Sequence, residues 1–283
     1  MSRVLLILSL LAATGCSSTG EDSEVPYDDL VDADTDAPAP DFGCPDTPPS
    51  AAVRYDSRFE TVLGATMHYY EAGDPEKPVV LLLHGLPVSA YFWRNVMPYL
   101  EDDYRVIALD HIGFGKSGRP DGLDYGLEDQ VAYLDAFIEA KNLDDITVVG
   151  QDLGSWTGMT WASRNPEKVL AVALVEGIIP PLLPASTETT DPNLLGIWMA
   201  ARDPAMAPQM FVEDHFFLTT VLPQFTACGP TEEALAVYAE PWTDPESRHI
   251  LSATPAANPI DGSPATHVAS SEHSIDWLAP PDL

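Results

Sequence analysis

Basic residues are scarce in this chain of 283 residues: 13 Lys and Arg stand against 44 Asp and Glu, which gives a formal net charge of −31. Such a charge repels the phosphates of nucleic acids and anionic membrane surfaces. Nucleic-acid binding is therefore excluded. The hydrophobic content of 45% is ordinary for a packed core, so we expect a globular protein.

Long hydrophobic runs are also few, and the one at the N-terminus is too short to favour a membrane span. Arg3 precedes the apolar residues 4–13, and small residues then lead to Cys16. The stretch "LAATGC" is similar to a bacterial lipobox, although Ala13 stands where Leu or Val is usual. The resemblance implies a signal peptide over residues 1–15, cleavage before Cys16 and acylation of its thiol. An ordinary secretory signal and an uncleaved anchor are the alternatives.

Each of these alternatives exports the protein. The lipoprotein hypothesis adds a lipid anchor on a bacterial membrane, facing the periplasm or the exterior. Residues 17–50 hold ten Asp or Glu, six Pro and no Lys or Arg, so they cannot bury enough apolar surface to fold. We therefore expect residues 16–50 to form an acidic, proline-rich, disordered tether that holds the folded domain away from the membrane.

Cysteine is rare, with three residues in the chain. After Cys16, only Cys44 and Cys228 remain. Export permits a disulfide between them, and two unrelated thiols are the alternative.

The rest of the chain alternates strand and helix patterns. We predict a hairpin over residues 57–73 that turns at Gly64, strands over 78–85, 105–110, 144–150 and 169–177, and helices over 90–100, 127–138 and 155–165. Because these strands are apolar on both faces, they indicate an α/β fold class with a mostly parallel sheet and flanking helices.

Prolines cluster and strand patterns end at Ile178. We expect a helical cap over residues 178–262, with helices over 194–202 and 231–240, and a return helix of the core within 263–283.

The stretch "GFGKSG", residues 113–118, fits the spacing of a dinucleotide-binding loop and contains G-K-S. A P-loop would need a glycine where Asp110 stands. A dinucleotide site would need a helix to begin at the third glycine, where Arg119 and Pro120 follow. The surrounding sequence therefore argues against nucleotide binding.

The stretch "VVGQDLGSW", residues 148–156, contains a second glycine-rich turn, and its flanking sequence suits a strand–turn–helix. A strand leads into its G-x-D-x-G turn, and a helix leads out of it. In a nucleophile elbow of this kind the central residue projects from the carboxyl end of the sheet, and the glycines permit close backbone contacts. We therefore predict Asp152 as a functional residue. A helix N-cap is the alternative for Asp152.

Four stretches, "HGLPVSAYFWRN", "DHIGFGKSGRP", "GQDLGSW" and "VEGIIPP", resemble in order and spacing the haloalkane dehalogenases of the α/β-hydrolase superfamily. The resemblance runs from residue 51 to residue 283. It implies a hydrolase core over residues 51–177, a helical cap, a small apolar substrate that is either halogenated or not, and neither a cofactor nor a metal ion.

The resemblance also implies roles for individual residues. Asp152 would attack a saturated carbon and form an alkyl ester, since a carboxylate is already ionised at neutral pH. Glu176 would be the acid that orients a catalytic histidine, unless it is only a solvated carboxylate at a strand end. The backbone N–H groups of Leu86 and Leu153 would form the oxyanion hole.

Two departures from the family pattern limit the resemblance. Leu86 and Leu153 stand where dehalogenases usually have Asn and Trp side chains that donate N–H groups to the departing halide, and leucine donates nothing. Trp198, Trp242 or an amide of the cap are the candidate replacements. The second departure concerns the catalytic histidine. The family carries it in a loop after the last strand of the sheet, and this sequence lacks the two strand patterns that should precede that loop.

None of the seven histidines matches that position: His68, His84, His111, His215, His249, His267 and His273. We expect structural or surface roles for them, a sheet without its last strands, and an unpaired apolar edge. A haloalkane dehalogenase-like hydrolase without its base is the leading hypothesis. The alternatives are an epoxide hydrolase or another hydrolase of the fold, and a non-catalytic lipid-anchored binding protein. Epoxide hydrolases usually protonate the leaving oxygen with two tyrosines of the cap, and Tyr238 is the only tyrosine after Tyr133. Substrate and oligomeric state stay open.

Overall fold

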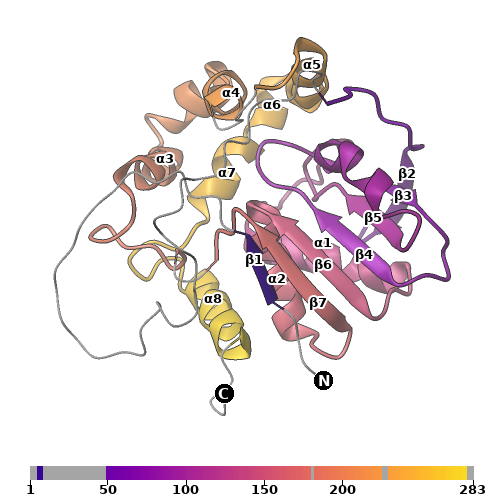
Figure 1. Ribbon diagram of the computed structural model, residues 1–283. Helices are drawn as coiled ribbons and strands as arrows, with labels where there is room; N and C mark the ends of the chain where they lie inside the picture. Colours follow the sequence, from indigo (N-terminus) through magenta and orange to yellow (C-terminus); the bar gives the residue numbers. More distant parts are fainter. Residues whose placement is uncertain (1–4, 9–48, 180–181, 225–228, 279–283) are drawn as a thin grey trace, which may run out of the picture.

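A seven-stranded sheet organises the computed structural model, which describes residues 5–8, 49–179, 182–224 and 229–278 (Figure 1). The spatial order is β1-β7-β6-β4-β5-β3-β2. The pairs β2–β3 and β3–β5 are antiparallel, and the other described pairs are parallel. The strands are β1 (Leu5–Leu8), β2 (Arg58–Val62), β3 (Ala65–Ala72), β4 (Val79–Leu83), β5 (Arg105–Leu109), β6 (Ile146–Gln151) and β7 (Val169–Val175). The predicted α/β fold class, the hairpin and the four strands are confirmed.

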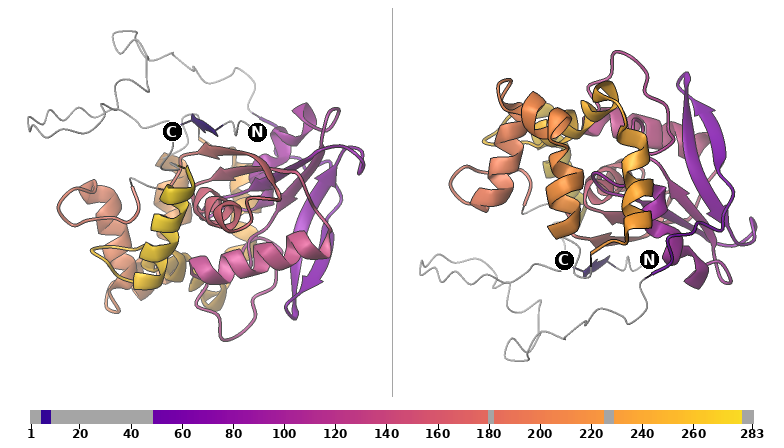
Figure 2. Two further views of the ribbon diagram at one scale, coloured as in Figure 1. Left: turned by 90° about the horizontal axis from the view of Figure 1, so that it is seen from below. Right: turned by 90° about the horizontal axis from the view of Figure 1, so that it is seen from above.

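Three helices cover one face of the sheet: α1 (Leu127–Ala140), α2 (Leu153–Arg164) and α8 (Ala265–Leu278). They lie side by side in the view from below, and α2 packs between the other two (Figure 2). The other face carries 3-10 segments, η2 (Ala90–Asn95) and η3 (Met97–Tyr99), where we expected one helix. Pro98 explains this difference, because it lacks the N–H that a continuous α-helix would need.

Alternate strand residues supply the two cores. Leu81 and Ile107 point into the larger core with α1 and α2. Their neighbours Leu82 and Ala108 point into the smaller core, which also contains Trp93. All five of these side chains are at most 4% exposed. The period of two along a strand thus explains why the central strands are apolar on both faces.

The outer side of the sheet differs from our expectation. The edge of β7 is not unpaired: β1 pairs with it in parallel, with Leu5 opposite Val172 and Leu8 opposite Val175. Burial of β7 is nevertheless incomplete, and Leu170 is 54% exposed. The prediction of an unpaired edge is therefore wrong for the chain that retains its N-terminal apolar run, because this run provides hydrogen-bonding partners there.

Residues beyond β7 form a cap of short helices over the carboxyl ends of the strands (Figure 1). The cap contains α3 (Pro192–Arg202), η4 (Pro208–Glu213), η5 (Phe217–Val221), α4 (Leu222–Gln224), α5 (Glu232–Ala239), η6 (Glu240–Trp242), α6 (Pro245–Arg248) and α7 (Ile250–Ala256). Helix α3 packs against α7. The helical cap and its helices near residues 194–202 and 231–240 are present as expected.

The turn between β6 and α2 brings backbones unusually close. A Cβ on Gly154 would overlap the carbonyl oxygen of Leu83, and a Cβ on Gly150 would overlap the backbone of Gly154. No side chain fits at either position. The two glycines therefore allow α2 to begin directly against the end of β4, where Asp152 is held.

Replacing Gly154 with alanine should destabilise the fold, because the new methyl group has no space next to the Leu83 carbonyl. We expect the free energy of unfolding to fall by roughly 1–3 kcal/mol, the usual cost of overpacking. Urea denaturation at neutral pH measures the change.

Gly196 provides the matched control. It lies within α3, and a Cβ there meets nothing within 4 Å. Gly196→Ala should leave stability unchanged or raise it by up to about 1 kcal/mol. Equal effects of the two substitutions would contradict the steric explanation.

Candidate active site

Asp152 lies in a strained turn between β6 and α2, with φ 51° and ψ −118°. It occupies the N-cap position of α2, yet its side chain makes no capping hydrogen bond. Instead, the Leu86 backbone N–H donates to Asp152 Oδ1 over 2.9 Å. The N-cap alternative is therefore wrong, and the strain serves to direct the carboxylate toward the loop after β4.

The surroundings of Asp152 favour its protonated form. Removal of water around the carboxylate raises its pKa to about 6, and the charge of Glu176 acts in the same direction. The backbone N–H groups of Leu86 and Leu153 lower the pKa but do not outweigh the desolvation. Asp152 is consequently ionised at neutral pH and loses its charge as the pH falls through about 6.

Glu176 lies immediately after β7, also at a positive φ of 50°. It is exposed, and its Oε2 accepts a hydrogen bond of 2.7 Å from Gln151 Nε2. The second polar atom of that amide, Gln151 Oε1, is buried without a hydrogen-bond partner. Sequence reasoning missed Gln151, although its position directly before Asp152 was a signal for a role in the site.

Asp152 and Glu176 line one cavity of about 220 Å³ between the core and the cap. The loop after β4 contributes Leu86, and the start of α2 contributes Leu153. The four residues predicted from sequence for catalysis and the oxyanion hole are thus brought together. The other lining residues come mostly from the cap and are mainly apolar: Pro87, Val88, Phe92, Gln151, Ile178, Leu194, Ile197, Trp198, Phe217, Val221, Leu222, Thr254, Pro255 and Asn258.

All seven histidines lie among the described residues, and none is found in the lining of this cavity. His68 is buried against Asp110, with 2.7 Å between Nδ1 and Oδ2. His84 and His111 are fully buried, and desolvation lowers the pKa of both rings. His267 contacts the Ala257 carbonyl oxygen through Nδ1 over 2.7 Å. The expectation that these histidines are structural is supported for the buried ones.

The cap side chains that carry hydrogen-bond donors differ in whether those donors are already used. Trp242 donates its indole N–H to the Pro87 carbonyl oxygen over 3.1 Å, so it is occupied. Trp198 lines the Asp152 cavity. Tyr238 is not part of the described lining, and its hydroxyl receives a hydrogen bond from Arg94. This arrangement removes the tyrosine that the epoxide hydrolase alternative required.

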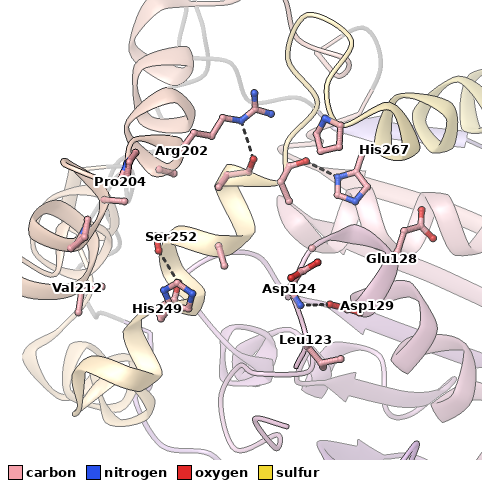
Figure 3. A pocket seen from close by; sticks show the side chains of 18 residues that line it. Leu123, Asp124, Glu128, Asp129, Arg202, Pro204, Val212, His249, Ser252 and His267 are labelled. Carbon is pink, nitrogen blue, oxygen red and sulfur yellow. Dashed lines mark hydrogen bonds between the residues drawn. The ribbon is translucent and has the colours of Figure 1, made fainter. Parts of the chain in front are cut away.

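A second cavity of about 690 Å³ lies on the other side of α7, between the cap and the loop that leads into α1 (Figure 3). Its polar side chains are largely engaged. Arg202 donates to the Ala256 carbonyl oxygen over 3.0 Å, and Asp129 accepts from the Asp124 backbone N–H over 2.8 Å. Neither Asp152 nor Glu176 reaches this space, so the smaller cavity is the candidate active site.

The glycine-rich loop at residues 113–118 wraps a carboxylate of its own chain. The Lys116 backbone N–H donates to Asp110 Oδ2 over 2.8 Å, and a Cβ on Gly115 would overlap that carboxylate. The loop thus makes a turn around Asp110, in agreement with the rejection of a nucleotide site.

Other predicted features lie outside the described residues, namely Cys16, Cys44 and Cys228. Within the described part of the chain, no helix is long and apolar enough to cross a membrane. The same residues contain no group of three His, Cys, Asp or Glu side chains suited to a metal ion.

A parallel sheet with a strained nucleophile-type turn and a cap over its carboxyl ends defines an α/β hydrolase, and the family model described as "alpha/beta hydrolase fold" matches residues 78–214. Haloalkane dehalogenases from Mesorhizobium japonicum and Agrobacterium fabrum are each 37% identical to this chain. The alignments cover 75% and 76% of this chain and 68% and 69% of the relatives.

Solved structures agree with these relatives. A putative ancestral haloalkane dehalogenase superposes with a TM-score of 0.73 at 38% identity, covering 78% of this chain and 76% of that chain. The haloalkane dehalogenase DbeA from Bradyrhizobium elkani superposes with a TM-score of 0.74 at 33% identity, covering 79% and 76%. The chain therefore belongs to the haloalkane dehalogenase family of α/β hydrolases, and it is a hydrolase of that type.

Because its pKa is raised, ionised Asp152 should lower the free energy of unfolding. Its folded pKa of about 6 exceeds the ordinary value of 3.8, so ionisation opposes folding as the pH rises from about 4 to about 6. Asp152→Asn should therefore stabilise the protein above pH 6, by roughly 1–2 kcal/mol after allowance for cavity water. The gain should shrink toward zero below pH 4 in chemical denaturation curves.

Asp110 offers a control of opposite sign. Burial pushes its pKa up, but the hydrogen bond from His68 and the backbone N–H of Ala90 outweigh burial and lower it. Asp110→Asn should therefore destabilise the protein at neutral pH. A destabilising Asp152→Asn at pH 8 would refute the electrostatic interpretation.

Proposed function

We propose that Asp152 is the nucleophile of a haloalkane dehalogenase-like reaction and forms an alkyl ester with the substrate. The observation that carries the proposal is the position of the Asp152 carboxylate in the cavity, where the Leu86 N–H donates to Oδ1. The attack forms a bond between Oδ2 and the substrate carbon, and the carbon–halogen bond breaks with its electron pair leaving on the halide. No proton moves in this step, so no base is required.

The second step is hydrolysis of the ester. Water would attack the carbonyl carbon of the ester, and the negative charge would develop on Oδ1. The backbone N–H groups of Leu86 and Leu153 act on the Asp152 carboxylate, which supports their role as the oxyanion hole. Glu176 is the proposed acid that orients a base.

This chain offers no histidine in the described lining of the cavity to act between Glu176 and the attacking water. A histidine typically contributes 10²- to 10⁴-fold to such a step. We therefore propose that the chain, as it stands, completes ester formation and stalls before hydrolysis.

The substrate class follows from the cavity. Its volume of about 220 Å³ is below the range of roughly 300–1,000 Å³ that is typical for drug-sized ligands. Its cap walls include Leu194, Ile197, Phe217 and Val221. These features support a small apolar haloalkane with a short chain.

A covalent adduct on Asp152 tests the proposed function. Incubation of the full chain with 1-bromobutane should add one butyl group and release one bromide per chain, because the ester forms but is not hydrolysed. Intact mass spectrometry and a bromide assay measure the two products. The rate of adduct formation should fall as the pH decreases through about 6, since protonation removes the nucleophile.

Two variants serve as controls for this experiment. Asp152→Asn should form no adduct. Asp124→Asn should react like the unmodified chain, because Asp124 lines the other cavity. An adduct of equal yield in Asp152→Asn would assign the alkylation to another nucleophile and exclude Asp152.

We also propose that the chain is exported and lipid-anchored through Cys16, as its lipobox-like sequence suggests. Expression in a bacterium that is fed labelled palmitate should give a labelled, membrane-bound product. Cys16→Ser should abolish labelling and move the protein to the soluble fraction, whereas Cys44→Ser should change neither. Labelling that persists in Cys16→Ser would exclude this site of acylation.

A further inference from the structure

The Asp152 cavity has few groups that can bind an anion. The core residues around the nucleophile, Leu86, Pro87 and Leu153, carry no side-chain N–H or O–H groups. A halide formed among apolar walls without hydrogen-bond donors would be strongly disfavoured. Any donors for it must therefore come from elsewhere in the lining.

Four side chains of the described lining carry N–H or O–H groups: Gln151, Trp198, Thr254 and Asn258. Thr254 uses its only O–H on the Tyr125 carbonyl oxygen, and Gln151 is held by the N–H that it donates to Glu176. The other two belong to the cap and its last segment. They are therefore the candidates for binding the leaving group.

Trp198 projects from α3 and is only 4% exposed. Among the described residues its indole N–H has no hydrogen-bond partner, whereas Trp161 and Trp242 donate to Asp135 and Pro87. Because Trp198 lines the cavity, its indole N–H can donate to an anion there without first breaking another hydrogen bond. Trp198 is thus available in the way that the halide-binding step requires.

Asn258 follows α7 and is also 4% exposed. Its backbone is fixed on both sides: its N–H donates to the Pro255 carbonyl oxygen, and its own carbonyl oxygen accepts from Arg202. Arg202 also binds the carbonyl oxygens of Ala256 and Ser263. The side-chain amide has no partner within the described part of the chain, so a rigid backbone presents a free donor to the cavity.

We infer that Trp198 Nε1 and Asn258 Nδ2 bind the halide as it leaves the substrate carbon. The inference rests on the proposed nucleophilic role of Asp152. Attack by Oδ2 and departure of the halide require no further reactant, and the two N–H groups accept the developing charge. The donors at the leaving group thus come from the cap, whereas the nucleophile comes from the core.

The effect of the leaving group tests this assignment. Ester formation by the full chain is measured under single-turnover conditions with 1-chlorobutane, 1-bromobutane and 1-iodobutane. Trp198→Phe and Asn258→Leu should each slow the reaction of the chloride by roughly ten- to a hundredfold, the value of one charge-assisted hydrogen bond. The iodide should be affected less, because it accepts hydrogen bonds weakly. A general structural disturbance would slow all three equally.

Trp161→Phe is the matched control, since it also removes a buried indole, and Trp161 does not belong to the described lining of the cavity. It should leave all three rates unchanged. Asn258→Leu changes the side chain and not the backbone contacts of Asn258. If Trp198→Phe fails to fold, the rates of Asn258→Leu therefore test whether a cap donor binds the halide. Unchanged rates and chloride-to-iodide ratios in a folded Asn258→Leu variant would overturn its assignment. Absence of any adduct in the unmodified chain would instead refute the proposed function.

Discussion

The close approach of α2 to the end of β4 is the constraint on which the candidate site depends. Gly150 and Gly154 permit it, because a side chain at either position would occupy the space of neighbouring backbone. The approach forces Asp152 into a positive φ and directs its carboxylate toward the Leu86 N–H. A single local feature of the backbone thus positions the carboxylate, its hydrogen-bond donor and the floor of the cavity.

Much of this arrangement is encoded locally and was predictable from sequence. Apolar runs interrupted by glycine identify β4, β6 and β7, and a glycine on each side of Gln151–Leu153 identifies the strained turn. The edge of the sheet was not predictable, because β1 pairs with β7 across more than 160 positions and pairing at that distance leaves no local pattern. The 3-10 segments after β4 were mistaken for a helix because their apolar spacing resembles one, although Pro98 interrupts it.

The cap could be predicted from the sequence only in part. Its helices were predicted from composition, but the direction in which each side chain points depends on how short helices pack over the core. Trp198 and Trp242 were equivalent candidates in the sequence, and packing separated them: one lines the cavity and the other binds the Pro87 carbonyl oxygen. Asn258 lies in no motif, and Gln151 was not singled out although it directly precedes Asp152 in the elbow. Their positions are set by tertiary contacts, which sequence periodicity does not report.

The energetic design of the site divides the reaction between two layers. The core supplies a carboxylate whose desolvation raises its pKa to about 6, which strengthens it as a nucleophile while leaving it ionised at neutral pH. Among the described lining residues of that layer, the side-chain donor beside Asp152 is Gln151, which already donates to Glu176, so we expect cap residues to stabilise the charge on the leaving group. A cap residue that donates to the leaving group would therefore act only as the bond breaks. Such an interaction lowers the barrier without tightening the binding of the uncharged substrate, and differential stabilisation of this kind is the source of catalysis.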